Sequence, residues 1–246
     1  MGEDGGMPGD SRYREAAPPP AAQTRVRRLW RYRAADAPAE PARILPDGCI
    51  DLIWDGRALF VAGPDRIAAM AALVPGSVLT GLRLAPGAAR DVLGVPMQEL
   101  TGTRVALSAL WGRRAQSLEA GLAAGQQTPA QLLLDAVARA PATADTRMAW
   151  LFARLSSADA PRLPVLARQL AMSERTLRRH CLAHFGYGPK TLDRILRLQR
   201  LLSAPRPGTL TEAALAAGYA DAAHLVHDSR DLTGLTPGAL LHAHGR

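Results

Sequence analysis

The sequence has little cysteine and few aromatic residues, and it has a single lysine. The two cysteines of the 246-residue chain, Cys49 and Cys181, form neither a CxxC motif nor a recognised Cys/His zinc spacing. A disulfide framework and a structural zinc site are therefore not indicated, and a reducing compartment fits. No apolar run approaches the roughly 18 residues of a membrane span, and the first thirty residues lack the apolar region of a signal peptide. We expect a cytoplasmic protein without a membrane anchor.

Histidine is missing from the first 179 residues, which bears on any enzyme chemistry there. Cys49 lies in the segment PDGCIDL, between Asp47 and Asp51. A catalytic thiolate needs a histidine or a positive neighbour, whereas two carboxylates would raise the pKa of the thiol. The favoured interpretation is a half-buried cysteine after a structural turn, with a DNA-targeted enzyme using the Cys49 region as the alternative. No phosphate-binding GxxxxGK[ST] motif is present, so we expect no enzyme, no catalytic residue and no cofactor.

Basic charge is abundant and unevenly placed. The chain holds 30 lysines and arginines against 22 acidic residues, a net charge of +8, and Lys190 is its one lysine. Residues 162–206 hold ten of these bases against Glu174 and Asp193, so this stretch carries the whole excess. A polyanionic partner is indicated, although a basic stretch often serves only solubility and arginine bias also reflects a GC-rich genome.

The amino-terminal part predicts a short disordered arm over residues 1–11 and then an α+β domain over 12–142. The prolines at 18–20 exclude a helix and extend the loose beginning. Short apolar segments alternate with turn signals and predict a small, mostly antiparallel sheet, with Asp55-Gly56 as the best hairpin turn. The segments are 42–45, 49–54, 58–62 and 78–84. Helices over 107–124 and 129–140 follow, the first stopped by Gly125.

Residues 143–246 predict an all-α domain that begins with a helix over 147–155. A helix from Pro164 to Leu170, a corner at Ala171-Met172 and a helix over 174–184 capped by Ser173 form a helix-turn-helix unit. A long helix over 191–203 follows.

The pattern then recurs in a second unit. Thr211 caps a helix over 212–217, Gly218 supplies a corner with a positive φ, and Asp221 caps a last helix through Leu232. Two such units so close together rarely arise by chance. The fold class is therefore an α+β domain followed by an all-α double helix-turn-helix domain.

The helical wheel sorts the side chains of the helix over 174–184 into two faces. Leu177, Cys181, His184 and Phe185 form an inward stripe. The opposite face carries Arg175, Arg178 and Arg179, which suit the major groove because a guanidinium bonds bidentately to guanine. On the helix over 191–203 the arginines Arg194, Arg197 and Arg200 remain for solvent or for DNA backbone.

These residues resemble the AraC/XylS family of bacterial transcription regulators. The resemblance is carried by GYADAAHL at 218–225, LTGLTP at 232–237, and residues 167–177 with Phe185-Gly186 and Pro189. The amino-terminal half resembles a sensor-type domain found ahead of this module, which has no assigned ligand, through residues 45–52, 62–64 and 81–89.

The resemblance implies a one-component regulator that binds double-stranded promoter DNA. The candidate DNA-binding residues are Arg175, Arg178, Arg179, Ser173, Lys190, Arg194, Ala222, Ala223, His224 and His227. Further candidate partners are RNA polymerase, a small-molecule effector in the amino-terminal domain and a second copy of the chain. The alternative is a nucleoid-type protein that binds DNA without sequence preference.

The second motif departs from the family pattern. His227 stands where an arginine is common, and Ser229 where a large apolar residue is usual; Cys181 and Ala171 replace a bulkier residue and a corner glycine in the first motif. A left-handed Ala171 would cost about 1 kcal/mol. We expect the first motif to supply most affinity and base recognition.

Two pairs of histidines invite a functional interpretation. His180 and His184 have the i, i+4 spacing of a helical metal pair, but no carboxylate lies close by in the sequence, so we expect no metal. His224 and His227 suit either pH-sensitive DNA contacts or, as the favoured interpretation, packing and phosphate contact without a switch.

Overall fold

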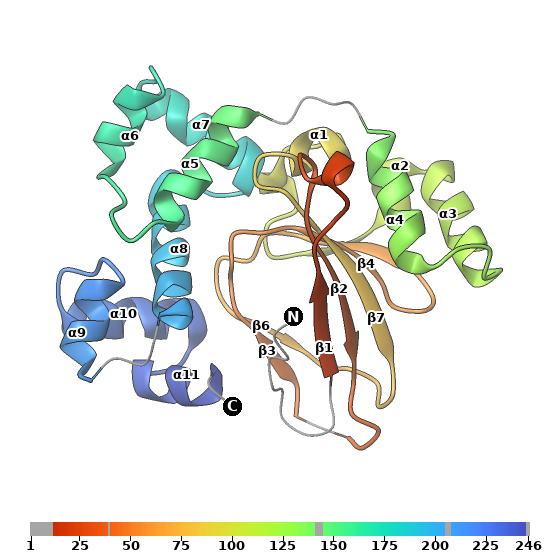
Figure 1. The fold of residues 1–246 in the computed structure, drawn as a ribbon, viewed down its shortest axis with the longest axis horizontal. Coiled ribbons are helices and arrows are strands. Elements are labelled where there is room, and N and C mark those ends of the chain that lie inside the picture. Colours follow the sequence, from red (N-terminus) through yellow and green to blue (C-terminus); the bar gives the residue numbers. More distant parts are fainter. Residues whose placement is uncertain (1–11, 39, 141–144, 205–207, 245–246) are drawn as a thin grey trace.

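The computed structural model describes residues 12–38, 40–140, 145–204 and 208–244. The predicted arm at 1–11 and the predicted domain boundary at 142 lie outside these ranges. A twisted sheet with its own helices lies beside a group of helices formed by the carboxy-terminal part of the chain (Figure 1). The predicted fold class is confirmed.

The amino-terminal sheet is antiparallel throughout. Its six main strands follow the order β1-β2-β7-β4-β5-β8, and β3 and β6 form a separate two-stranded sheet. The strands are β1 (Arg12–Ala16), β2 (Val26–Arg33), β3 (Ala42–Ile44), β4 (Asp51–Trp54), β5 (Leu59–Ala62), β6 (Ala69–Ala71), β7 (Val78–Leu84) and β8 (Arg104–Ala106).

The predicted hairpin turn at Asp55-Gly56 joins β4 to β5. Asp55 Oδ1 accepts hydrogen bonds from the backbone N–H groups of Arg57 and Ala58, both at 2.8 Å. Four strands were not predicted, namely β1, β2, β6 and β8. β2 has the sequence VRRLWRYR and buries only Val26 and Trp30, so its apolar alternation is weak.

Helices pack against the sheet, some of them beside the carboxy-terminal domain and others on the side away from it (Figure 1). They are η1 (Pro20–Ala22), α1 (Ala89–Leu93), η2 (Met97–Glu99), α2 (Leu107–Trp111), α3 (Arg113–Ala123) and α4 (Pro129–Ala138). Gly112 divides the single helix predicted over 107–124 into α2 and α3. The expectation that the prolines at 18–20 exclude any helix was wrong, because Pro20 occupies the first position of a short 3-10 helix, where its missing N–H is not needed.

The carboxy-terminal domain consists of helices alone within the described residues. They are α5 (Thr146–Ser156), α6 (Leu163–Gln169), α7 (Glu174–Phe185), α8 (Pro189–Ser203), α9 (Leu210–Ala216), α10 (Ala222–Thr233) and α11 (Pro237–His244). α8 runs between the two helix-turn-helix units, with α6 and α7 at one end and α9 to α11 at the other (Figure 1). The helix predicted as the last is followed by α11, which begins at Pro237.

Each domain buries its own hydrophobic core. One core joins the sheet to α1 through α4, and the other joins α5 to α11 and also takes in Leu45 and Cys49 from the amino-terminal domain. None of the helices in the described ranges combines the length and apolar character of a membrane span.

Candidate nucleic-acid interface

The first helix-turn-helix unit consists of α6, a tight corner and α7. Ala171 lies at the corner, where the sequence predicted a tight turn, with a left-handed φ of 52°. The Met172 N–H donates to the Ala167 carbonyl at 2.9 Å, which closes the end of α6. Ser173 Oγ accepts from the Thr176 N–H at 3.1 Å and begins α7, as predicted.

The two faces of α7 follow the prediction. The buried residues are Leu177, Cys181, His184 and Phe185. Arg175, Arg178 and Arg179 are exposed, and within the described ranges none of the three forms an ion pair. Ser173 and Lys190 are also exposed, at the amino ends of α7 and α8. The structure therefore presents three unpaired guanidinium groups on one helix.

The second unit repeats this construction with α9 and α10. Gly218 forms the corner with a φ of 87°, and Asp221 caps α10 by accepting from the His224 N–H at 2.7 Å. Thr209, rather than the predicted Thr211, begins α9, because Thr209 and Glu212 form a reciprocal capping box. α7 and α10 both have 12 residues and both end at a glycine with positive φ.

The predicted contact residues of α10 offer little cationic chemistry, although the exposed Arg230 lies further along the same helix. Ala222 and Ala223 are small, and the ring of His224 packs edge-on against Tyr219 with centroids 5.2 Å apart. His227 is 70% exposed, and its Nδ1 lies 3.4 Å from Asp231 Oδ2. Ser229, which stands where a large apolar residue is usual, is fully buried, and its hydroxyl donates to the Leu235 carbonyl at 2.8 Å.

Arg194 corrects the expectation for the long helix α8. Its Nε donates to Asp228 Oδ1 at 2.8 Å, and its Nη2 donates to Asp231 Oδ2 at 2.9 Å. Asp228 is buried, so this ion pair joins α8 firmly to α10. The guanidinium that we expected to remain for solvent or DNA is instead paired with two carboxylates of α10.

The other two arginines of α8 are engaged in the same way. Arg197 donates to Asp193 and lies over the ring of Tyr219, 5.2 Å from its centroid. Arg200 donates to the carbonyls of Leu155 and Ala217, at the ends of α5 and α9. Three of the ten bases in the stretch 162–206 therefore position the second unit instead of remaining for DNA.

The amino-terminal domain contacts the carboxyl ends of both recognition helices, which the sequence did not reveal. Thr101 Oγ1 donates to the Gly186 carbonyl at 2.9 Å, at the end of α7. Arg43 Nη1 donates to the Thr233 carbonyl and the Ala68 N–H to the Leu232 carbonyl, each at 2.7 Å, at the end of α10. The last carbonyls of a helix lack partners within the helix, and a cation there is favourable. We call these contacts the helix-end clamp. They bond the sheet domain to the carboxyl ends of α7 and α10.

The turn of the PDGCIDL segment packs into the helical domain. Gln199 Nε2 donates to the Pro46 carbonyl at 2.8 Å. Gly48 has a φ of 78° and lies so close to α5 and α8 that a Cβ there would sit 3.0 Å from Phe152 and 3.4 Å from Leu192. The segment thus docks one domain on the other.

An ionic cluster holds the same turn in place. Arg83 contacts Asp47 at 3.4 Å, Asp51 at 3.2 Å and Glu15 at 3.5 Å. Cys49 lies beside this cluster, where burial and the neighbouring Asp47 raise the pKa of its thiol. The thiol is therefore protonated at neutral pH, which opposes a role as a nucleophile.

The structure also corrects the expectation that no carboxylate accompanies His180 and His184. Asp145, at the start of α5, places its Oδ2 3.5 Å from His180 Nδ1 and 3.8 Å from His184 Nε2. Burial lowers the pKa of His184, whose imidazole is neutral at pH 7.

Comparisons with known proteins agree with this geometry. Residues 166–243 match a helix-turn-helix domain family, and residues 14–106 match a domain of unknown function (DUF6597). No curated protein sequence matches the chain. The chain is a DNA-binding transcription regulator, as its double helix-turn-helix domain and the family match over that domain indicate. Its helix-turn-helix domain is joined to an amino-terminal domain that matches a family of unknown function.

Several solved structures resemble parts or most of the chain. A probable AraC family transcriptional regulator from Rhodopseudomonas palustris CGA009 is 27% identical over 38% of this chain and 88% of its own, with a TM-score of 0.32. A DNA-binding transcriptional dual regulator from Escherichia coli K-12 is 20% identical over 37% of this chain and 95% of its own, with a TM-score of 0.30. ToxT from Vibrio cholerae O395 is 10% identical over 87% of this chain and 96% of its own, with a TM-score of 0.45.

Proposed function

We propose that this regulator recognises its promoter sites mainly through α7. Arg175, Arg178 and Arg179 would enter the major groove and bond to guanine edges, while Ser173 and Lys190 would contact phosphates beside it. α10 would contribute Ala222, Ala223, His224 and His227, a set with far less capacity for hydrogen bonds to bases.

The observation that carries this proposal is the contrast between the arginines of α7 and α8. The guanidinium groups of α7 have no partner among the described residues, whereas Arg194, Arg197 and Arg200 of α8 are paired within the protein. A guanidinium that is already bonded inside the protein would have to break those bonds to bind a phosphate. The unpaired groups of α7 are ready for DNA at no such cost.

The helix-end clamp suggests how the amino-terminal domain controls binding. A ligand or partner that shifts the sheet domain would move Thr101 against α7 and Arg43 against α10. Two recognition helices bind one duplex only when their spacing matches the groove repeat, about 34–36 Å for successive major grooves. We therefore infer that the sheet domain regulates DNA affinity by setting the relative position of the two helices.

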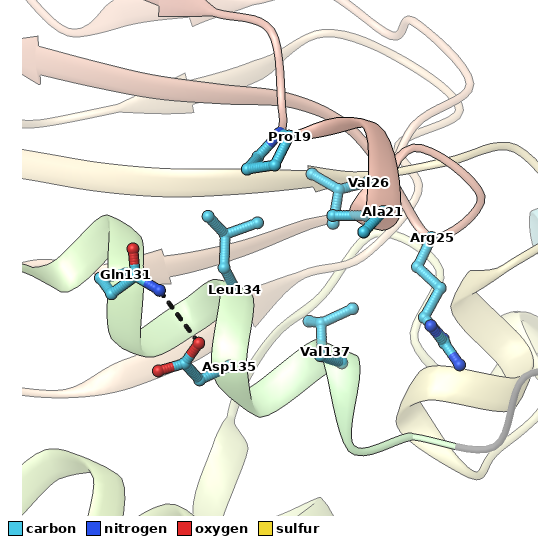
Figure 2. A pocket seen from close by; sticks show the side chains of 10 residues that line it. Pro19, Ala21, Arg25, Val26, Gln131, Leu134, Asp135 and Val137 are labelled. Atoms are coloured by element: carbon cyan, nitrogen blue, oxygen red, sulfur yellow. Dashed lines mark hydrogen bonds between the residues drawn. The ribbon is translucent and has the colours of Figure 1, made fainter.

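A pocket between η1 and α4 is a candidate entry for an effector. Figure 2 shows Leu134 and Val137 of α4 facing Pro19 and Val26, with Arg25 at the edge. Its volume is about 170 Å³, below the roughly 300–1,000 Å³ of ordinary ligand pockets. An effector bound here would be very small or would move η1 away from α4. RNA polymerase and a second copy of the chain remain further proposed partners.

The test is selection of bound fragments from a genomic library, followed by affinity measurements on the enriched sequence and on random DNA. We expect fragments near promoters and an affinity ratio of about 10³ or more. A ratio below about tenfold would instead indicate a nucleoid-type binder without sequence preference.

A further inference from the structure

Three ligand groups meet where the recognition helix α7 touches the start of α5. Asp145, His180 and His184 bring a carboxylate oxygen and two imidazole nitrogens within 4.8 Å of one another. His180 and His184 lie one turn apart on α7, and their rings stack with an interplanar angle of 9°. Asp145 comes from a different helix, so the group exists only in the folded chain.

Each group is held in a defined orientation. The Nδ1 of His184 lies 3.1 Å from the Gly87 carbonyl, and because a carbonyl oxygen can only accept, Nδ1 carries the proton. The lone pair of His184 is therefore on Nε2, which lies 3.8 Å from Asp145 Oδ2. A second ring nitrogen that donates to a backbone carbonyl is typical of histidines that bind metals.

The centre of the group lacks hydrogen bonds. Nδ1 of His180 is buried and has no hydrogen-bond partner in the structure, although it lies 3.5 Å from Asp145 Oδ2. Asp145 is bonded to Arg147, whose Nε and Nη2 donate to its two oxygens at 3.1 Å. Arg147 is 54% exposed and can turn into solvent, which would leave Asp145 Oδ2 for another cation while Oδ1 still accepts from the Arg147 N–H at 3.0 Å.

The types of the three ligand groups indicate which metal ion they would bind. Two imidazoles and one carboxylate suit Zn²⁺, with a water at the fourth position of a tetrahedron. Zinc bonds of about 2.0–2.2 Å place adjacent tetrahedral ligand atoms about 3.3 Å apart, close to the two separations from Asp145. We propose that Asp145, His180 and His184 form a zinc site that fastens α7 to the start of α5 and, through His184 and Gly87, to the sheet domain. This inference does not depend on how α7 recognises DNA.

The experiment uses the full chain, free of affinity tags and stripped of metal with a chelator. Zinc binding is measured by competition with a chromophoric chelator, and Co²⁺ serves as a spectroscopic substitute. We expect one zinc per chain, a tetrahedral Co²⁺ spectrum, and a rise in the thermal unfolding midpoint with added zinc.

Two variants test the ligands, and a third is the matched control. Asp145→Asn keeps an oxygen that can cap α5, and His180→Gln changes a partly exposed side chain, so circular dichroism should show that both variants fold. Each should weaken zinc binding by more than the about 10- to 100-fold that loss of an outer-shell partner costs, and should abolish the thermal shift. His244→Gln removes an exposed histidine in α11 and should bind zinc as the parent chain does.

Three results would overturn the proposal. The first is the absence of saturable one-to-one zinc binding by the parent chain. The second is zinc affinity that both ligand variants retain. The third is zinc binding without any change in the unfolding midpoint, because a metal at this junction must stabilise the folded state.

Discussion

At the scale of single residues, the two helix-turn-helix motifs use different residues at a corner that requires a positive φ. Gly218 turns the second corner with a φ of 87°, at no steric cost. Ala171 turns the first with a φ of 52°, which for a residue with a Cβ costs roughly 1–2 kcal/mol. The first corner therefore stores strain in the motif that carries the unpaired arginines.

Ala171→Gly should remove this strain. Because glycine also has more freedom in the unfolded chain, we expect a net gain of about 0.5–1 kcal/mol in the free energy of unfolding. Urea unfolding measures it. Ala183→Gly, inside α7, is the control of opposite sign and should lose about 1 kcal/mol. A loss at Ala171 would contradict the assignment of strain.

Arg178→Ala tests the role of α7 in base recognition. An electrophoretic shift assay on the selected site should show a loss of roughly 1–3 kcal/mol and a relaxed preference at one base pair. Arg57→Ala, an exposed arginine in the turn between β4 and β5, is the control and should leave DNA binding unchanged. A uniform loss on all sequences would make Arg178 a phosphate contact, and no loss would remove it from the interface.

At the scale of elements, α8 acts as the frame on which the second unit is mounted. Its Arg194, Arg197 and Arg200 recur every three residues and contact α10, Tyr219 and the end of α9 in turn. The helix pattern placed these arginines on one face but left open what the face meets. Their partners come from helices that only the tertiary fold brings alongside.

Arg194→Ala should therefore lower the free energy of unfolding without removing a contact to DNA phosphate. Breaking a buried ion pair costs about 3–5 kcal/mol and breaking an exposed pair about 0–1. Asp228 is buried while Arg194 is 35% exposed, so we expect an intermediate loss of about 1–3 kcal/mol in the free energy of unfolding.

The salt dependence of DNA binding separates this role from a phosphate contact. DNA affinity falls with salt concentration on a log–log plot, and the magnitude of this slope counts phosphate contacts. It should stay unchanged in Arg194→Ala and should decrease by about 1 in Lys190→Ala. Lys190→Ala should unfold like the parent chain. A reduced slope in Arg194→Ala would return Arg194 to the DNA interface.

At the scale of the whole molecule, the two domains are joined at several separate places. The docked turn at Gly48, the helix-end clamp at Thr101 and Arg43, and the bond from His184 to Gly87 lie along the length of the helical domain. In the proposed regulation, contacts spread in this way would carry a change in the sheet domain to both recognition helices together.

Gly48→Ala measures the docking of the turn. Gly48 and Gly56 both have positive φ, but a Cβ at Gly56 meets nothing within 4 Å, whereas one at Gly48 approaches Phe152 at 3.0 Å. Both variants should have a lower free energy of unfolding, because alanine is strained at a positive φ. Gly48→Ala should lose about 1 kcal/mol or more in addition, because its Cβ overpacks against Phe152. Denaturant unfolding of the two variants gives the difference, and equal losses would show that the turn does not bear on the helical domain.

The prediction from sequence was accurate where local chemistry decides. Ser173 and Asp221 cap their helices, Asp55-Gly56 makes its hairpin, and the buried stripe of α7 follows helical periodicity, because each depends on residues within a turn or two. β2 was missed because its arginines hide the alternation of a strand that is buried at only two positions.

Local sequence patterns were enough to predict the two helix-turn-helix units, their corners, the caps Ser173 and Asp221, and the concentration of basic charge between residues 162 and 206. The tertiary structure alone decided which of those bases are unpaired, because Arg194 meets Asp228 across 34 positions of the chain. It likewise brought Asp145 to the histidines of α7 and the sheet domain to the ends of both recognition helices. Ion pairs and ligand groups form between side chains that are close in space, and only packing of whole elements sets those distances.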